Sequence, residues 1–209
     1  MSNFSLALLI SLLGLDTTIA FQVLISQPVF ACSIIGWLMG DPMTGMEIGA
    51  IMQMIWLNML PVGAASFPEG NIASMLVCVI VIRFADLDIP NTVFAVAFVY
   101  GMIVSYVGAQ LTTLDRRLNT RILKWAQQAA EQADLHKLTL LDMLSIAFYL
   151  IIMVFLSFIM LWLADVIFPL LSSLPPSWET RLQFVKPVVW GIGIALTAAL
   201  IIRKKPGKN

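Results

Sequence analysis

An unusual density of polar side chains lies between residues 14 and 71, in an otherwise apolar part of the sequence. These polar residues are Asp16, Gln22, Gln27, Asp41, Thr44, Glu47, Gln53, Asn58, Glu69 and Asn71. Amide and carboxylate groups hydrogen-bond hydroxyl-rich ligands, and an aromatic side chain such as Trp37, Trp56 or Phe67 covers the apolar side of such a ligand. Ionisable groups cost roughly 2.5–3.5 kcal/mol each inside a bilayer and normally face a bundle interior or a watery pathway. The pattern predicts a polar site, suited to a sugar, within an apolar protein.

The composition predicts a polytopic, all-α transmembrane helical bundle. Of the 209 residues, 60% are hydrophobic and 11% are charged, and the mean hydropathy is +0.93. Soluble domains carry about 25% charged residues. The formal net charge is +0, so we expect no nucleic-acid partner and expect the lipid bilayer to be the surroundings.

The apolar residues fall into stretches of unequal length. They cover 4–25, 28–40, 45–65, 72–84, 89–114, 144–171 and 188–202. A simple span needs about 20 apolar residues, so the short stretches 28–40 and 72–84 predict re-entrant or broken helices in the N-terminal half. Such segments are tolerated at membrane depth where they are buried in protein or line a cavity, and they often build transporter sites. The first stretch, which lacks a basic leader, predicts a retained span and not a removed signal peptide.

The charges divide the chain into four parts. Residues 1–114 form the predicted membrane core, whose few basic residues leave it without a predicted orientation. Residues 115–142 form a polar segment with a predicted surface helix of two to five turns, 143–202 hold two transmembrane helices, and 203–209 form a basic tail. The basic residues Arg116, Arg117, Arg121 and Lys124, together with those of the tail, place both polar segments in the cytoplasm.

One helical stripe combines small, polar and aromatic residues. Gly45, Gly49 and Gln53 recur every four residues, and Trp56 continues the stripe. Small residues at this spacing let a neighbouring helix approach closely. Gln53 is therefore either a polar contact between helices or a substrate contact, and both readings stay open. Asn58 lies on a different helical face from Gln53, so only a broken arrangement brings both to one ligand.

Proline and glycine mark the predicted structural turns. Asp41 precedes Pro42 and predicts a turn in which the carboxylate caps the following helix, while Gly45 begins the packing stripe. Pro61 and Gly63 interrupt the third apolar stretch.

Two carboxylates near these turns keep open assignments. For Glu69 three roles remain open: a substrate ligand, a helix cap or a residue of an exposed loop. Asp16, beside two threonines in the first stretch, is either structural or functional.

The sequence shows no arrangement of residues that predicts catalysis by this chain. We find no serine–histidine–acid set, glycine-rich phosphate loop or metal-ligand cluster, so no catalytic residue, cofactor or metal is expected. Cys32 and Cys78 lie in apolar runs and are expected to be small buried side chains. We expect a non-catalytic permease subunit, and any chemistry on a substrate has to come from another chain.

Several motifs together resemble the IIC subunits of bacterial phosphotransferase systems of the mannose/fructose/sorbose family. They are GLDTTIAFQ at 14–22, SQP at 26–28, GWLMGDPMTG at 36–45, QMIWL at 53–57 and LPVGAASFPE at 60–69. Their order and spacing carry the resemblance over about residues 12–75, and hydropathy extends it more loosely to about 203.

The resemblance implies a function and partners. Such a chain pairs with a IID membrane subunit in the bacterial inner membrane, where an oligomer is expected. Cytoplasmic IIA and IIB subunits bring phosphate from phosphoenolpyruvate, and a hexose or amino sugar is phosphorylated as it enters. Gln22, Gln53 and Glu69 match polar contacts of the family's sugar site, and Asp16, Asn58 and Trp56 complete the expected substrate-binding set.

The sequence also departs from the family pattern. Many members carry a basic residue where this chain has Gln27, and the neutral amide is expected to alter substrate preference or remove a charge pair. Family chains commonly continue beyond the point that matches residue 202, so we expect either a shorter subtype or a chain without part of the usual core. Two other functions remain open, an ion-coupled secondary transporter and a non-transporting membrane scaffold or receptor.

Overall fold

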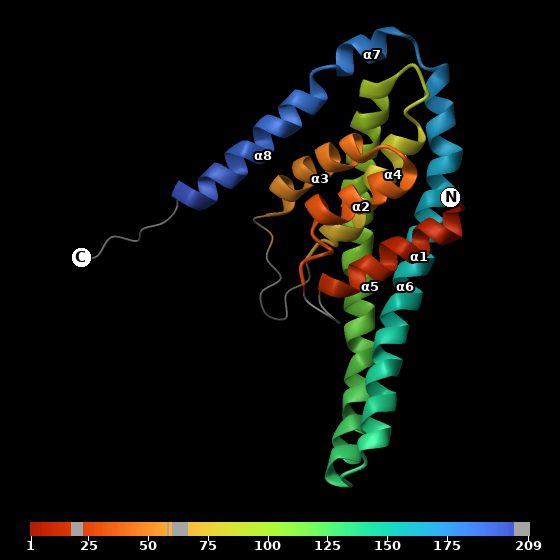
Figure 1. Ribbon diagram of the computed structural model, residues 1–209, viewed down its shortest axis with the longest axis vertical. Helices are drawn as coiled ribbons and strands as arrows, with labels where there is room; N and C mark the ends of the chain where they lie inside the picture. Colours follow the sequence, from red (N-terminus) through yellow and green to blue (C-terminus); the bar gives the residue numbers. More distant parts are fainter. Residues whose placement is uncertain (18–22, 58, 60–66, 203–209) are drawn as a thin grey trace, which may run out of the picture.

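The protein is built from α-helices. The computed structural model describes residues 1–17, 23–57, 59 and 67–202, and no strand occurs among them. Its helices are α1 (Asn3–Gly14), α2 (Pro28–Met39), α3 (Pro42–Trp56), α4 (Gly70–Arg83), α5 (Pro90–Glu131), α6 (Leu135–Leu170), α7 (Ser177–Leu182) and α8 (Val185–Ile202) (Figure 1). The predicted all-α fold is confirmed.

Helices long and apolar enough to cross a membrane lie in the C-terminal part. Within the described residues these are Pro90–Glu131, Leu135–Ser173 and Ser177–Ile202. They confirm a multi-pass membrane protein. In contrast, α1 to α4 have only 12 to 15 residues each, which corresponds to about 18–23 Å at 1.5 Å per residue, less than the ~30 Å hydrocarbon core. The predicted short helices of the N-terminal half are also confirmed.

The prediction of one continuous span over residues 4–25 is wrong. The helix α1 ends at Gly14, and a single 3₁₀ turn follows at Leu15–Thr17. The Asp16 carboxylate accepts hydrogen bonds from the backbone N–H groups of Val23 and Ser26. These contacts fold the chain back on itself, whereas a continuing helix would carry residues 23 and 26 away from Asp16.

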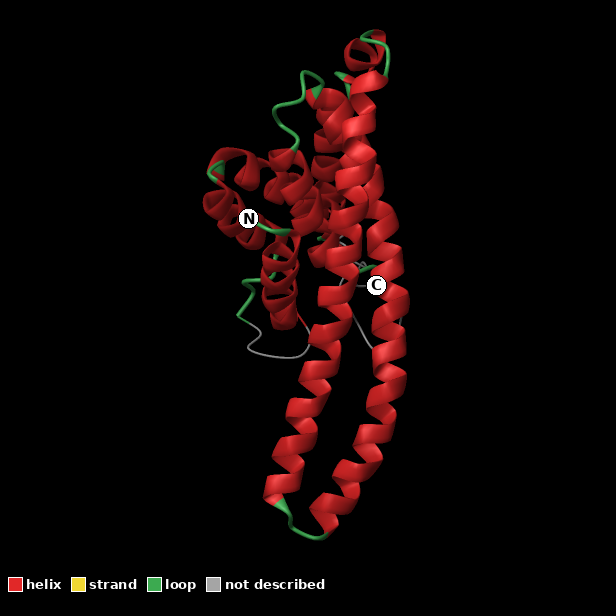
Figure 2. Cartoon of the chain, turned by 90° about the vertical axis from the view of Figure 1, so that its right-hand side faces the viewer, coloured by secondary structure: helices red, strands yellow, loops and turns green. Residues whose placement is uncertain are grey.

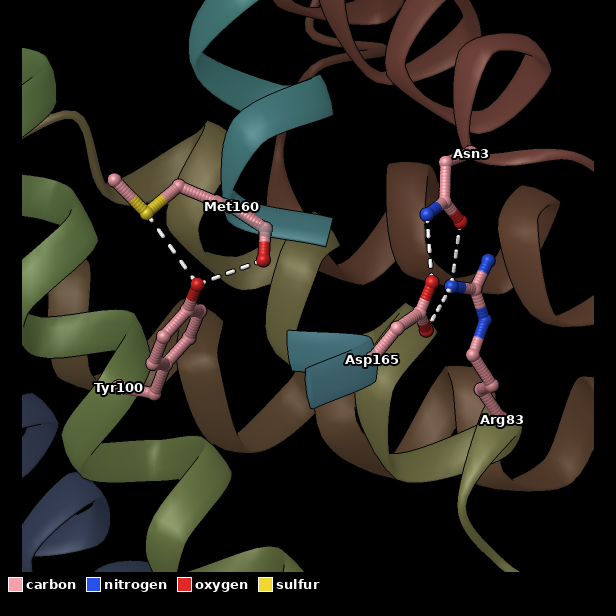
Figure 3. Close-up of polar contacts among 5 residues, drawn as sticks. All are labelled: Asn3, Arg83, Tyr100, Met160 and Asp165. Atoms are coloured by element: carbon pink, nitrogen blue, oxygen red, sulfur yellow. Dashed lines mark hydrogen bonds and ion pairs between the residues drawn. The ribbon is translucent and has the colours of Figure 1, made fainter. Parts of the chain in front are cut away.

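The helices α5 and α6 form a long antiparallel hairpin that supports the rest of the chain. They lie side by side along the long axis, with the short helices packed against one end of the pair and the hairpin loop projecting beyond them (Figures 1 and 2). The Tyr100 hydroxyl of α5 donates a hydrogen bond to the Met160 carbonyl of α6 over 2.7 Å (Figure 3). The helix α8 runs obliquely along α3.

The polar segment 115–142 does not form a separate surface helix as expected. Instead, α5 continues without interruption through Glu131, and α6 starts at Leu135. No glycine or proline occurs between Gly108 and Asp134, and the alanine-rich sequence favours continued helix. The segment is therefore the far end of the α5–α6 hairpin.

The helix α4 forms the centre of the short-helix block. All of its residues from Ile72 to Ile80 are buried, as expected for a helix that is hydrophobic on every face. At its C-terminal end, Arg83 pairs with Asp165 of α6 over 2.7 Å and donates to the Asn3 side chain of α1 (Figure 3). This polar contact joins α1 and α4 to the hairpin.

Candidate functional site

The ends of several short helices meet at one place, next to the long helix α5. The start of α2 lies against α3, because a Cβ atom added to Gly49 would be 2.6 Å from the Pro28 carbonyl. The start of α4 lies against the end of α3, because a Cβ atom on Gly70 would be 2.5 Å from the Trp56 ring. The polar residues around these ends form the candidate site.

Asp16 organises the chain between α1 and α2. Its side chain is 3% exposed, and its two carboxylate oxygens accept from the N–H groups of Val23, over 2.7 Å, and Ser26, over 3.2 Å. The structure thus gives Asp16 a supporting position, in which it holds the segment that leads into α2.

Gln53 connects α3 to the start of α2. Its side-chain N–H donates to the Gln27 side-chain oxygen over 2.9 Å, and its own oxygen receives a long 3.5 Å hydrogen bond from the Val29 N–H. Gln27 makes no side-chain cap on α2, so Gln53 satisfies a backbone donor that the first helical turn leaves unpaired. Both the N–H and the oxygen of the Gln53 side chain therefore form hydrogen bonds, and the bond to the oxygen is the longer and weaker of the two.

Asn71 extends the network to α4. Its side chain donates to the Ser26 hydroxyl over 3.3 Å, and the Ser26 N–H is the group bound by Asp16. The turn before α2 therefore receives polar contacts from Asp16, Gln53 and Asn71, which come from separate parts of the chain.

Trp56 provides an aromatic surface beside this network. Its side chain is 8% exposed and packs directly over Gly70, where any larger residue would clash. Its indole N–H is buried and has no hydrogen-bond partner among the described residues. An unpaired buried N–H costs about 1–3 kcal/mol.

Glu69 lies in a notch on the surface of α5. A Cβ atom on Gly108 would be 2.7 Å from the Glu69 Cβ atom, so glycine at this position makes room for the carboxylate. The Thr112 hydroxyl donates to Glu69 over 2.5 Å, and the Glu69 N–H donates to the Ser105 carbonyl over 2.9 Å. Ser105, Gly108 and Thr112 share one face of α5, which thereby fixes the start of α4.

Asp41 and Gly45 lie at the other end of α2 and α3. The Asp41 carboxylate caps α3 by accepting from the Thr44 N–H over 3.0 Å, and Gly40 ends α2 with a φ of 90°. Gly45 touches α2, because an added Cβ atom would be 2.5 Å from the Cys32 carbonyl and 2.8 Å from the Gly36 Cα atom. The turn and the stripe of glycines therefore hold α2 against α3.

Four of the residues singled out in the sequence lie outside the described residues: Gln22, Asn58, Pro61 and Gly63. The structure brings Asp16, Gln53, Trp56 and Glu69 to the same group of helix ends. Their direct hydrogen-bond partners include Thr112 for Glu69, Ser26 for Asp16 and Gln27 for Gln53. Thr112 lies 43 residues from Glu69, and no local sequence signal pointed to it.

Among the described residues, no group of three or more His, Cys, Asp or Glu side chains could hold a metal ion.

The N-terminal helices are too short to span a membrane, polar groups gather at their ends, and long helices pack beside them. This arrangement defines a class of multi-pass membrane protein with broken helices. The family model of the sorbose-specific IIC component of phosphotransferase systems matches residues 1–206. The chain belongs to this family.

Individual relatives agree with this assignment. The chain is 25% identical over 183 residues to the sorbose-specific EIIC component of Klebsiella pneumoniae, covering 84% of this chain and 64% of that protein. It is 33% identical over 108 residues to the sorbose-specific EIIC component of Lacticaseibacillus casei, covering 52% and 37%. It is 28% identical over 109 residues to the mannose-specific EIIC component of Escherichia coli K12, covering 52% and 39%. The chain thus spans less than two thirds of the length of these relatives.

Solved structures show the same fold. One, described as the structure of a membrane protein, has a TM-score of 0.73 and 21% identity, covering 95% of this chain and 79% of that one. A second, from a complex of the mannose transporter ManYZ with microcin E492, has a TM-score of 0.66 and 20% identity with the same coverage.

Proposed function

We propose that this chain is the sugar-conducting membrane subunit of a phosphotransferase system and carries a hexose or an amino sugar. The observation that supports this most directly is the polar network at the meeting helix ends, around Asp16, Gln53 and Glu69, with Trp56 beside it. Membership of the family gives the class of transport system.

The network offers the groups that a sugar needs. The carboxylate of Glu69 accepts hydrogen bonds from sugar hydroxyls, and the amide of Gln53 both donates and accepts. Its 3.5 Å contact with Val29 is the weakest in the network, so a sugar hydroxyl displaces it at low cost. The buried indole N–H of Trp56 donates to a ring or hydroxyl oxygen.

Partner chains supply the chemistry in this proposal. A IID membrane subunit completes the passage, and cytoplasmic IIA and IIB subunits deliver the phosphoryl group as the sugar arrives. The fold shared with a chain of the ManYZ complex supports assembly with a second membrane subunit, and we propose that the complex is an oligomer in the bacterial inner membrane.

The test is uptake of labelled hexoses and amino sugars by cells that lack the chain and by cells in which it is restored. We expect one sugar to accumulate as its phosphate only when the chain is present. Gln53→Ala should lower that uptake at unchanged membrane expression, because the variant loses both amide contacts. Gln128→Ala is the matched control, since Gln128 is exposed on the far part of α5.

The other outcomes separate the competing functions. Entry of unmodified sugar that stops when the membrane potential collapses would support an ion-coupled secondary transporter. Normal uptake by Gln53→Ala, combined with loss of function on changing Arg116 and Arg117, would support a scaffold or receptor.

A further inference from the structure

Glu69 occupies the N-cap position of α4, but its side chain does not cap that helix. Short polar side chains at an N-cap accept hydrogen bonds from the unpaired N–H groups of the first helical turn. The Glu69 carboxylate instead accepts a hydrogen bond from Thr112 of α5. Of the three roles that the sequence left open for Glu69, the helix cap is therefore excluded.

Three residues of α5, each about one helical turn from the next, contact successive parts of Glu69. The Ser105 carbonyl accepts a hydrogen bond from the Glu69 N–H over 2.9 Å. Gly108 leaves space for the side chain, because an added Cβ atom would be 2.7 Å from the Glu69 Cβ atom and 3.0 Å from its Cγ atom. The Thr112 hydroxyl donates to Oε1 over 2.5 Å. Glu69 therefore lies along α5 from its backbone to its carboxylate.

The hydroxyl of Thr112 is used differently from other threonine hydroxyls of the hairpin. Those of Thr113, Thr120 and Thr139 donate to the backbone carbonyl four residues earlier in the same helix, as is common for threonine within helices. A hydroxyl has a single proton, so the hydrogen bond from Thr112 to Glu69 takes the place of such a bond. The buried Thr112 thus serves a residue outside its own helix.

We propose that Thr112 is the positioning residue for the Glu69 carboxylate and thereby sets how tightly the sugar is bound. This inference rests on the proposed function, in which Glu69 accepts hydrogen bonds from sugar hydroxyls. With Oε1 bound to Thr112 and the Cβ atom against Gly108, the plane of the carboxylate is fixed, and with it the position of Oε2. The sugar then binds a carboxylate that is already ordered, so binding avoids the entropy cost of ordering a long side chain.

Arg116, one turn beyond Thr112, acts on the same carboxylate in a different way. Its guanidinium attracts the carboxylates of both Glu69 and Asp115. This attraction depends on distance and tolerates many orientations of the carboxylate, whereas a hydrogen bond weakens steeply with angle. Arg116 therefore favours the charge of Glu69, and Thr112 determines its orientation.

The test is equilibrium binding of labelled hexoses, including mannose and sorbose, to membranes that contain the full chain, without a phosphoryl donor. We expect Thr112→Val to bind the sugar about ten-fold more weakly, because the variant lacks the hydroxyl that orients the carboxylate. Thr112→Ser keeps a hydroxyl and should bind within about two-fold of the wild type. Thr120→Val is the matched control, since Thr120 is exposed on the same helix and its hydroxyl bonds within that helix.

A pair of glycines separates positioning of Glu69 from general loosening of the contact between α4 and α5. Gly108→Ala displaces the Glu69 side chain while keeping the Thr112 hydroxyl, and it should also weaken binding about ten-fold. Gly101→Ala clashes with Val77 of α4, away from Glu69, and should weaken binding less than two-fold. Because Gly108→Ala and Thr112→Val act on the same carboxylate, the double variant should lose about as much as either alone, and not the product.

The outcomes distinguish this inference from the function on which it rests. Unchanged binding by Thr112→Val, no recovery in Thr112→Ser, or equal losses in Gly101→Ala and Gly108→Ala would overturn the positioning role. So would unchanged binding by Glu69→Gln, although the proposed function would then stand. If the wild type binds no hexose of the panel, the proposed function fails, and the positioning role fails with it.

Discussion

Single glycines decide how closely the helices of the N-terminal block approach one another. At Gly45, an added Cβ atom would meet the Cys32 carbonyl at 2.5 Å, and at Gly191 an added Cβ atom meets nothing within 4 Å. Both glycines lie inside helices, so their intrinsic effects on helix formation are comparable. They differ in their surroundings, which makes them a matched pair.

We therefore expect Gly45→Ala to destabilise the protein by about 1–3 kcal/mol, because backbone atoms cannot move aside as a flexible side chain does. Gly191→Ala should be neutral or stabilising by up to about 1 kcal/mol, since alanine favours helix more than glycine does. Thermal unfolding of both variants in the same detergent checks this. Equal melting temperatures would contradict the contact between α2 and α3.

At the scale of the elements, a carboxylate from one helix caps another. Glu179 of α7 accepts hydrogen bonds from the N–H groups of Asn91 and Thr92, over 2.8 and 2.9 Å, and from the side chains of both residues. These are the second and third residues of α5, whose own N-cap residue, Ile89, makes no side-chain cap. The contact fixes the connection between α6 and α8 to the start of α5.

Glu179→Gln should destabilise the protein by about 1–2 kcal/mol, because it removes the negative charge from the N-terminus of α5 and weakens the cap. Hydrogen exchange at Thr92 and Val93 should become faster. Glu131→Gln is the control, because Glu131 is exposed at the opposite end of the same helix, where a negative charge is unfavourable. Equal effects of the two substitutions would argue against the cap.

At the scale of the whole molecule, the hairpin sets the direction of the chain across the membrane. The loop at Gln132 and the connection at Ser173 lie at opposite ends of α6, and the basic residues that follow Leu114 predict a cytoplasmic position for the loop at Gln132. We expect a membrane-impermeant thiol reagent to label Gln132→Cys only from the cytoplasm and Ser173→Cys only from outside. Cys32 and Cys78 are replaced by alanine in both. Labelling of both positions from one side would exclude this topology.

Hydropathy and local turn signals predicted the fold class and the short helices, because both depend on residues close in sequence. The turn at Asp41 and the glycine stripe through Gly45 have such local signals. The end of α1 was missed, because apolar composition does not stop a helix and the contacts of Asp16 reach residues 23 and 26.

The contacts of the candidate site depend mostly on long-range packing. Glu69 meets Thr112, and Glu179 meets Asn91 at a separation of 88 residues. Such contacts appear only when the helices are assembled. The continuity of α5, in contrast, was accessible from the sequence, since no glycine or proline separates its apolar and basic parts.

The direct backbone contact between α2 and α3 also limits how this protein moves. With Gly36, Gly45 and Gly49 leaving no space for side chains between the two helices, neither helix is able to slide or tilt without the other. We therefore expect α2 and α3 to move together as one rigid unit. Any displacement of α2 and α3 relative to α1 and α4 is therefore expected to move the pair as one unit, and it would strain the hydrogen bonds that join Ser26 to Asn71 and to Asp16.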